Sequence, residues 1–112
     1  MSRRLIVIAL SVILGLFLAP DIVAEENHIA EAIKNVKAAI EHGKEGHLNN
    51  LRTYVETALA HAEAAEKAAA NPHTKQAITH LNESVDHAKQ GHADVATKHA
   101  EEALTHLDAA KK

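Results

Sequence analysis

The sequence predicts an all-α fold: an antiparallel up-down four-helix bundle made of two duplicated helical hairpins, preceded by an N-terminal signal peptide. Apolar residues recur every three or four positions along most of the chain, which is the period of an α-helix. A gapless alignment of residues 28–67 with residues 73–112, at an offset of 45, leaves fourteen of 40 positions identical and indicates an internal duplication. Alanine is abundant and only one proline follows residue 24, which favours helices joined by short loops.

The beginning of the chain has the composition of a secretory signal peptide. Two arginines precede an apolar run at residues 5–18, and a small-residue cleavage site ends at Ala24. A membrane-spanning helix needs about 20 apolar residues, so this shorter run favours a cleaved signal over an N-terminal anchor. We therefore predict a signal peptide at residues 1–24, a mature domain at residues 25–112, a periplasmic location and no membrane association after cleavage.

The first repeat, residues 28–67, has the pattern of two amphipathic helices. Gly43 and Gly46 separate the two apolar faces and predict the turn between the helices. The apolar positions of the two faces are Ile29, Ile33, Val36 and Ile40, then Leu48, Leu51, Val55, Leu59 and Ala62.

The second repeat, residues 73–112, follows the same plan with a turn at Gly91. Asn71 before Pro72 predicts the start of its first helix, as an N-cap followed by a proline at the first helical position. Its apolar positions are Ile78, Leu81, Val85 and Ala88, then Ala93, Ala96, Ala100, Ala103, Leu104 and Leu107. Many of these are alanine, so we expect a thin core that a bound ligand would stabilise.

Composition excludes several function classes. The net charge is −3 and becomes −4 when Arg3, Arg4 and Asp21 leave with the signal peptide, which argues against a nucleic-acid partner. The chain has no cysteine, and its one methionine is Met1, so a bound metal must be held by nitrogen and oxygen. No nucleophile–base pair or phosphate-binding loop is recognisable, and we predict that the protein is not an enzyme.

Histidine is the residue type that points to a function. All ten histidines lie on ladders of heptad spacing, and in the first repeat the middle positions hold Asn35 and Tyr54 instead. A spacing of seven is about 10.5 Å along a helix, so two neighbours on one helix cannot share an ion. The ten are His28, His42, His47, His61, His73, His80, His87, His92, His99 and His106.

An antiparallel hairpin supplies a second histidine at each height. Residues whose numbers have a constant sum lie level with each other, which pairs His28/His61, His42/His47, His73/His106, His80/His99 and His87/His92. Glu83 and Glu102 each stand three residues after one histidine and four before the next, and Glu45 stands three after His42. The histidines flank the core, and the sequence leaves open whether the rows face each other within a hairpin or face the opposite hairpin.

Rows of imidazole on a helical scaffold indicate a binder of divalent transition metals. We predict several ions per chain, Cu(II) before Ni(II), Zn(II) or Co(II), held by the ten histidines with help from Glu83 and Glu102. The predicted role is metal homeostasis, storage or transport by a monomer whose protein partner the sequence does not identify. The alternative is a periplasmic interaction or chaperone module that senses acid through its histidines.

Three segments carry a family resemblance: Glu41–His47, Asp86–His92 and Val95–Leu104. They resemble the small metal-binding protein family of periplasmic, histidine-rich helical proteins from ammonia-oxidising bacteria. The resemblance covers essentially the whole mature chain and implies a four-helix bundle that binds Cu(II) and other divalent ions in copper homeostasis. The family pattern also implies histidine at positions 35 and 54, where this chain has Asn35 and Tyr54.

Overall fold

The computed structural model describes residues 24–111, which fold as the predicted all-α four-helix bundle. The first helix spans residues 24–44 and is followed by α2 (Leu48–Ala68), α3 (Pro72–Lys89) and α4 (Ala93–Lys111). Except for Ala24, the predicted signal peptide lies outside the described residues, and its cleavage stays a prediction. Among the described residues, no helix combines the length and the apolar character needed to cross a membrane.

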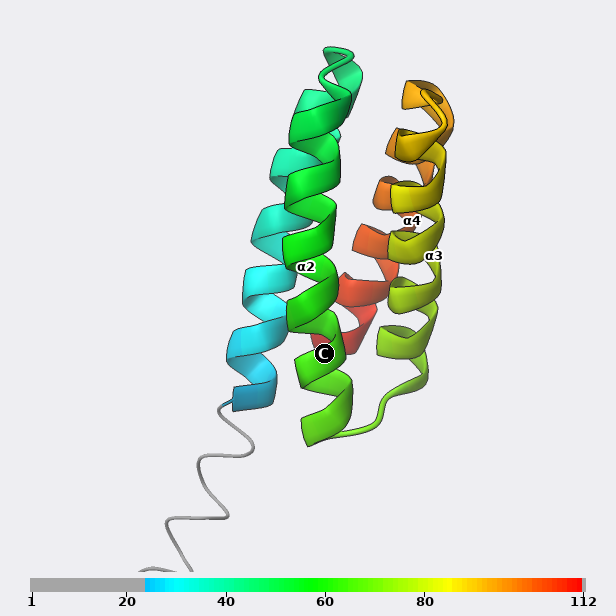
Figure 1. The fold of residues 1–112 in the computed structure, drawn as a ribbon. Helices are drawn as coiled ribbons and strands as arrows, with labels where there is room; N and C mark the ends of the chain where they lie inside the picture. The colour runs from blue at the N-terminus through cyan, green and yellow to red at the C-terminus, as the bar shows by residue number, and fades with distance from the viewer. Residues whose placement is uncertain (1–23, 112) are drawn as a thin grey trace, which may run out of the picture.

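The helices run up and down, with both hairpin turns at one end of the bundle (Figure 1). The connection between α2 and α3 and the C-terminus lie at the other end. Helix α3 packs against both α2 and α4, whereas α2 and α4 barely touch and therefore occupy diagonal corners. The groove within the first hairpin and the groove within the second hairpin consequently lie on opposite sides of the bundle.

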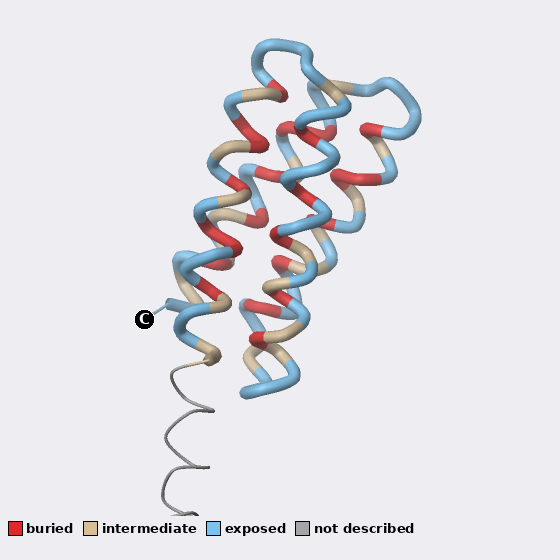
Figure 2. The backbone as a smooth tube through the Cα atoms, turned by 60° about the vertical axis from the view of Figure 1, so that its left-hand side comes forward, coloured by how far each residue is buried: buried red, intermediate tan, exposed pale blue. Residues whose placement is uncertain are grey.

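The core follows the predicted apolar faces, and Figure 2 shows its buried segments recurring along each helix while the turns are exposed. Leu48, Leu59, Ile78 and Leu104 are only partly buried and pack against the edge of the core. The buried apolar residues are Ile29, Ala32, Ile33, Val36, Ala39, Ile40, Leu51, Val55, Ala58, Ala62, Ala65, Ala77, Leu81, Val85, Ala88, Ala96, Ala100, Ala103 and Leu107.

The two repeats place their large core residues at different heights. Leu51 lies near the turn end of the bundle, and the second repeat has Ala96 at the equivalent position. Leu107 lies near the opposite end, where the first repeat has Ala62. All four side chains are fully buried. Each end of the core therefore holds one fully buried leucine, contributed by a different repeat.

The hairpin turns bring histidines of successive helices together. Gly46 and Gly91 have φ of 78° and 83°, a left-handed conformation that glycine adopts without steric cost. The chain then reverses tightly enough for the His47 N–H to donate to the His42 carbonyl at 2.8 Å. The His92 N–H donates to the His87 carbonyl at 2.9 Å in the same way. The sequence motif of each turn thus fixes one histidine pair at the end of the bundle.

The start of α3 agrees with its predicted capping signal. The Asn71 side chain accepts a hydrogen bond from the His73 N–H at 2.8 Å, and Pro72 occupies the first helical position. The Asn71 N–H donates to the Glu66 carboxylate at 2.8 Å, and Lys75 lies 3.8 Å from the same carboxylate. These contacts fix the connection between the two hairpins.

The prediction that Gly43 forms part of the turn is wrong. Gly43 is buried inside the first helix, which continues to residue 44. A Cβ atom there would lie 2.6 Å from the Leu51 Cδ1 atom and closer still to the Thr97 hydroxyl. The glycine is therefore required by the close approach of the first helix to α4, which is a packing constraint that the local sequence does not show.

We expect Gly43→Ala to lower the free energy of unfolding by about 1–2 kcal/mol. The added methyl group overpacks the core, and this destabilisation exceeds the stabilisation from the higher helix propensity of alanine. Urea denaturation followed by circular dichroism measures the loss. Thr97→Ala removes one of the two clashing groups, so the double variant should lose less stability than the sum of the two single variants. A loss in the double variant equal to the sum of the two single losses would contradict a clash at this position.

Candidate metal centre

The structure answers the question that the sequence left open, since all five histidine pairs form within hairpins. The Nδ1 atoms of His28 and His61 lie 2.9 Å apart, and those of His80 and His99 lie 3.1 Å apart. In the pair at the second turn, His87 and His92, this distance is 3.4 Å. The ring centroids of the remaining two pairs, His42/His47 and His73/His106, are separated by 5.8 Å and 6.1 Å.

The spacing within these pairs suits chelation. In the metal-free protein, one ring of a facing pair donates its Nδ1–H to the Nδ1 of the other ring. An ion bound at about 2.0–2.1 Å to both nitrogens holds them about 2.9 Å apart at a right angle and about 3.4 Å apart at the tetrahedral angle. The observed separations of 2.9–3.4 Å span this interval. A divalent ion can therefore replace the shared proton with little movement of the helices.

The second hairpin carries an uninterrupted ladder of six imidazoles. In addition to the level pairs, His80 stacks on His106 with ring centroids 5.6 Å apart, and His87 stacks on His99 at 5.5 Å. His80, His87, His99 and His106 therefore each lie against a ring at another height as well as against their level partners, while His73 and His92 at the two ends contact their level partners. Helical repetition produces this arrangement, because residues seven apart on each helix return to the same groove after two turns.

Carboxylates complete the middle pair of this ladder. Glu83 lies 3.8 Å from His80 Nδ1 and 3.7 Å from His99 Nε2, and it therefore reaches both rings. Glu102 reaches across the hairpin to His80 Nε2, at 3.1 Å. The ligand atoms of His80, Glu83 and His99 all lie within 4.8 Å of one another. Both carboxylates that the sequence predicts as ligands are thus close to the middle pair.

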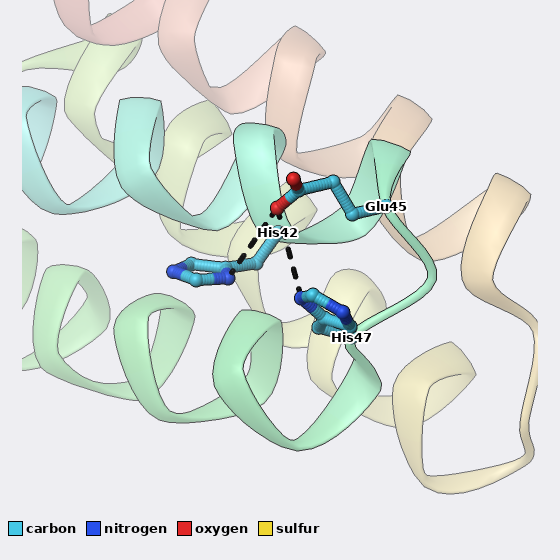
Figure 3. A group of neighbouring side chains, drawn as sticks. All are labelled: His42, Glu45 and His47. Carbon is cyan, nitrogen blue, oxygen red and sulfur yellow. Dashed lines mark ion pairs between the residues drawn. The ribbon is translucent and has the colours of Figure 1, made fainter.

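A second cluster forms at the first turn, where Figure 3 shows Glu45 between His42 and His47. The Glu45 carboxylate lies 3.9 Å from His42 Nδ1 and 3.6 Å from His47 Nδ1. Glu45 is absent from the predicted set of ligands, although its spacing from His42 is the same as that of Glu83 from His80. This spacing could therefore have identified Glu45 as a ligand from the sequence. The contact between its carboxylate and His47 depends on the turn and is seen only in the structure.

The middle of the first hairpin holds no histidine pair. Asn35 donates its side-chain N–H to the Glu31 carbonyl at 2.8 Å and is thus engaged with its own helix. Tyr54 stacks on His42, with ring centroids 5.5 Å apart and planes 8° apart. The aromatic ladder of the first hairpin therefore extends from the turn to Tyr54, and the His28/His61 pair stands apart at the far end.

Exposure differs between these groups. The side chains of His80 and His99 are 22% and 20% exposed, whereas that of His47 is 57% exposed. The middle pair of the second hairpin is thus held in the groove between two helices, and the turn cluster opens to solvent. Electrostatic attraction between an ion and a carboxylate is less screened in the groove than at the turn.

Paired imidazoles with nearby carboxylates, lining the groove of each hairpin, define this bundle as a candidate metal-binding protein of the nitrogen- and oxygen-donor class. The chain belongs to the small metal-binding protein family, whose model matches residues 2–110. No curated protein matches the chain. The family membership agrees with the resemblance carried by the turn motifs.

Proposed function

We propose that this protein binds and buffers divalent transition-metal ions in the periplasm, with Cu(II) as the principal ion. The observation that carries the proposal is the set of five cross-helix histidine pairs, three of which hold two ring nitrogens 2.9–3.4 Å apart. The family membership supports metal binding as the general function. A periplasmic location is supported by the signal-like composition of residues 1–24.

The donor set supports the choice of Cu(II). Imidazole and carboxylate suit divalent copper, nickel, zinc and cobalt, and among these the affinity of a nitrogen–oxygen site is generally greatest for copper. Cu(I) favours soft sulfur ligands, and the sequence has no cysteine and no methionine after Met1. An oxidising compartment outside the cytoplasm keeps copper in the divalent state that this donor set prefers.

The form of the sites supports buffering or transport rather than catalysis. Each pair supplies two nitrogen ligands, with carboxylates within reach at the His80/His99 and His42/His47 pairs. Donors on the bundle surface leave coordination positions open to water or to the ligands of a recipient. Such sites release ions readily, which is what a buffer or carrier requires.

Calorimetric titration with Cu(II), Ni(II) and Zn(II) tests this function. We expect several Cu(II) ions to bind per chain, more tightly than the other two ions. A variant with His80, His87, His92 and His99 each replaced by glutamine should lose the tightest binding, because two complete pairs, His80/His99 and His87/His92, are removed. Glutamine is of similar polarity, and the four side chains lie outside the core, so the helical circular-dichroism spectrum serves as the folding control.

Two results would contradict the proposal. The first is the absence of saturable binding of all three ions by the folded protein. The second is copper binding of equal strength in the folded glutamine variant, which would show that the second hairpin's ladder is a polar surface. Partner binding that is insensitive to chelators would then favour an interaction module.

A further inference from the structure

We propose that the two hairpins bind metal at non-equivalent primary sites, and that the first ion enters the middle of the second hairpin. This primary site consists of His80 and His99 with Glu83 and Glu102. The strongest site of the first hairpin is instead the turn cluster of His42, Glu45 and His47, which fills later. The inference rests on the proposed metal-binding function and adds to it the order in which the sites are occupied.

The internal repeat provides a comparison within one molecule. At the offset of 45, the positions of the four primary donors are occupied in the first hairpin by Asn35, Ala38, Tyr54 and Thr57. All four donors are therefore missing together, the two carboxylates along with the two imidazoles. If these glutamates only formed a solvated helix face, their presence in one repeat and absence from the other would not be expected to follow that of the histidines. This co-occurrence assigns Glu83 and Glu102 to the same site as His80 and His99.

The turns show the opposite difference. Glu45 corresponds to Gln90 in the second hairpin, so only the first turn carries a carboxylate between its two histidines. The Glu45 carboxylate reaches both rings of its pair, at 3.9 Å and 3.6 Å. Each hairpin thus has one pair supplied with negative charge, and the charged pair lies at a different height in each hairpin.

Charge and burial rank the two sites. The ligand atoms of Glu83 lie together with those of His80 and His99, and Glu102 contacts the outer Nε2 atom of His80, so two carboxylates balance the charge of a divalent ion at the primary site. The turn cluster has one carboxylate, Glu45, for its two imidazoles. The side chains of His80 and His99 are 22% and 20% exposed, whereas those of His42 and His47 are 29% and 57% exposed. Glu83 is 45% exposed and Glu45 is 63% exposed. The greater negative charge in a less screened groove binds a divalent cation more tightly. The ion therefore occupies the second hairpin first.

Tyr54 provides a probe for the order of filling. It is the only tyrosine of the chain, which also lacks tryptophan, so all tyrosine emission comes from this residue. Its ring stacks on His42, a member of the turn cluster. Paramagnetic Cu(II) bound at that cluster is in near contact with the phenol ring and quenches it. An ion in the groove of the second hairpin lies on the opposite side of the bundle.

We would titrate the metal-free protein with Cu(II) and follow Tyr54 fluorescence together with the NMR signals of the histidine rings. The first equivalent should broaden the signals of His80 and His99 and leave most of the Tyr54 emission intact. Quenching should follow at later equivalents. In the variant Glu83→Gln/Glu102→Gln, the first binding step should weaken about tenfold or more, on the scale expected when carboxylate partners of metal-bound histidines are removed. Quenching should then begin with the first equivalent.

A matched control removes two carboxylates from the same two helices without touching the ladder. Asp86 on α3 and Glu101 on α4 are exposed, and the described part of the structure shows neither in an ion pair with a histidine. Asp86→Asn/Glu101→Gln changes the net charge by the same amount and should keep the original order of filling.

Three outcomes overturn the inference while leaving metal binding in place. The first is quenching of Tyr54 by the first equivalent of Cu(II) in the unaltered protein. The others are an unchanged affinity of the first binding step in Glu83→Gln/Glu102→Gln, or a loss of that affinity in the control variant equal to the loss in Glu83→Gln/Glu102→Gln. A folded protein that binds no ion at all would instead contradict the proposed function. The two failures are therefore distinguishable in one titration series.

Discussion

Saturation with Cu(II) is expected to raise the midpoint of thermal unfolding by at least about 10 °C. Any ion that binds the folded bundle but not the unfolded chain stabilises it by mass action, by about 2.7 kcal/mol for one site at a free concentration one hundred times its Kd. In a domain of this size, each kcal/mol corresponds to about 4–8 °C. The effect should be large because each ion links two helices: His28/His61 join them at the end far from the turn, and His80/His99 join them at the middle of the hairpin.

Differential scanning calorimetry, or circular dichroism during heating, measures this shift. A chelator added in excess should return the midpoint to its metal-free value. Mg(II) is the matched control, because it prefers oxygen ligands and retains its water, so it should leave the midpoint unchanged. A midpoint that stays constant at saturating Cu(II) would show that the ions do not bridge the helices of the folded state.

Leu81→Ala is expected to lower the free energy of unfolding by about 2–5 kcal/mol, the range typical of large-to-small substitutions in a core. Leu81 is fully buried on α3, and within residues 24–111 only Leu51 and Leu107 are leucines buried to the same degree. The remaining core is mainly alanine and β-branched residues, which offer little to fill the cavity. Because small domains are stable by about 5–15 kcal/mol in total, this one substitution removes a large share.

Urea denaturation of the metal-free protein measures the loss, with Leu59→Ala as the matched control. Leu59 is only partly buried at the edge of the core, so its truncation should cost less than half as much. Cu(II) should recover part of the stability of Leu81→Ala, because its ligands remain in place. Equal losses at positions 59 and 81 would show that the interior leucines do not dominate the core.

Much of the fold could be predicted from the sequence, because each helix carries a local signal. The apolar period identified the inward faces, and the residues expected to lie inward, such as Val36, Val55 and Leu107, are buried. Asn71 and Pro72 marked the start of α3. The role of Gly43 could not be predicted in this way. A side chain at this position would clash with Thr97 on α4, and such a contact between distant parts of the chain leaves no local pattern in the sequence.

The histidine pairs could be predicted because they depend on two regular quantities, the rise of a helix and the position of the turn. With both fixed, level positions such as His80 and His99 follow by arithmetic, and the structure places them 3.1 Å apart. The metal that they bind and the location of the protein are not fixed by this geometry, and they remain proposals.

The sequence by itself determined four amphipathic helices, their division into two hairpins and the height of each histidine on its helix, since these properties depend on neighbours along the chain. Only the tertiary structure decided that the ladders face inward to their own hairpin grooves, that Glu102 crosses to His80, and that Glu45 lies between His42 and His47. Those contacts depend on the handedness of the bundle and on side-chain direction, which arise from how the helices pack and have no counterpart in spacing along a single helix.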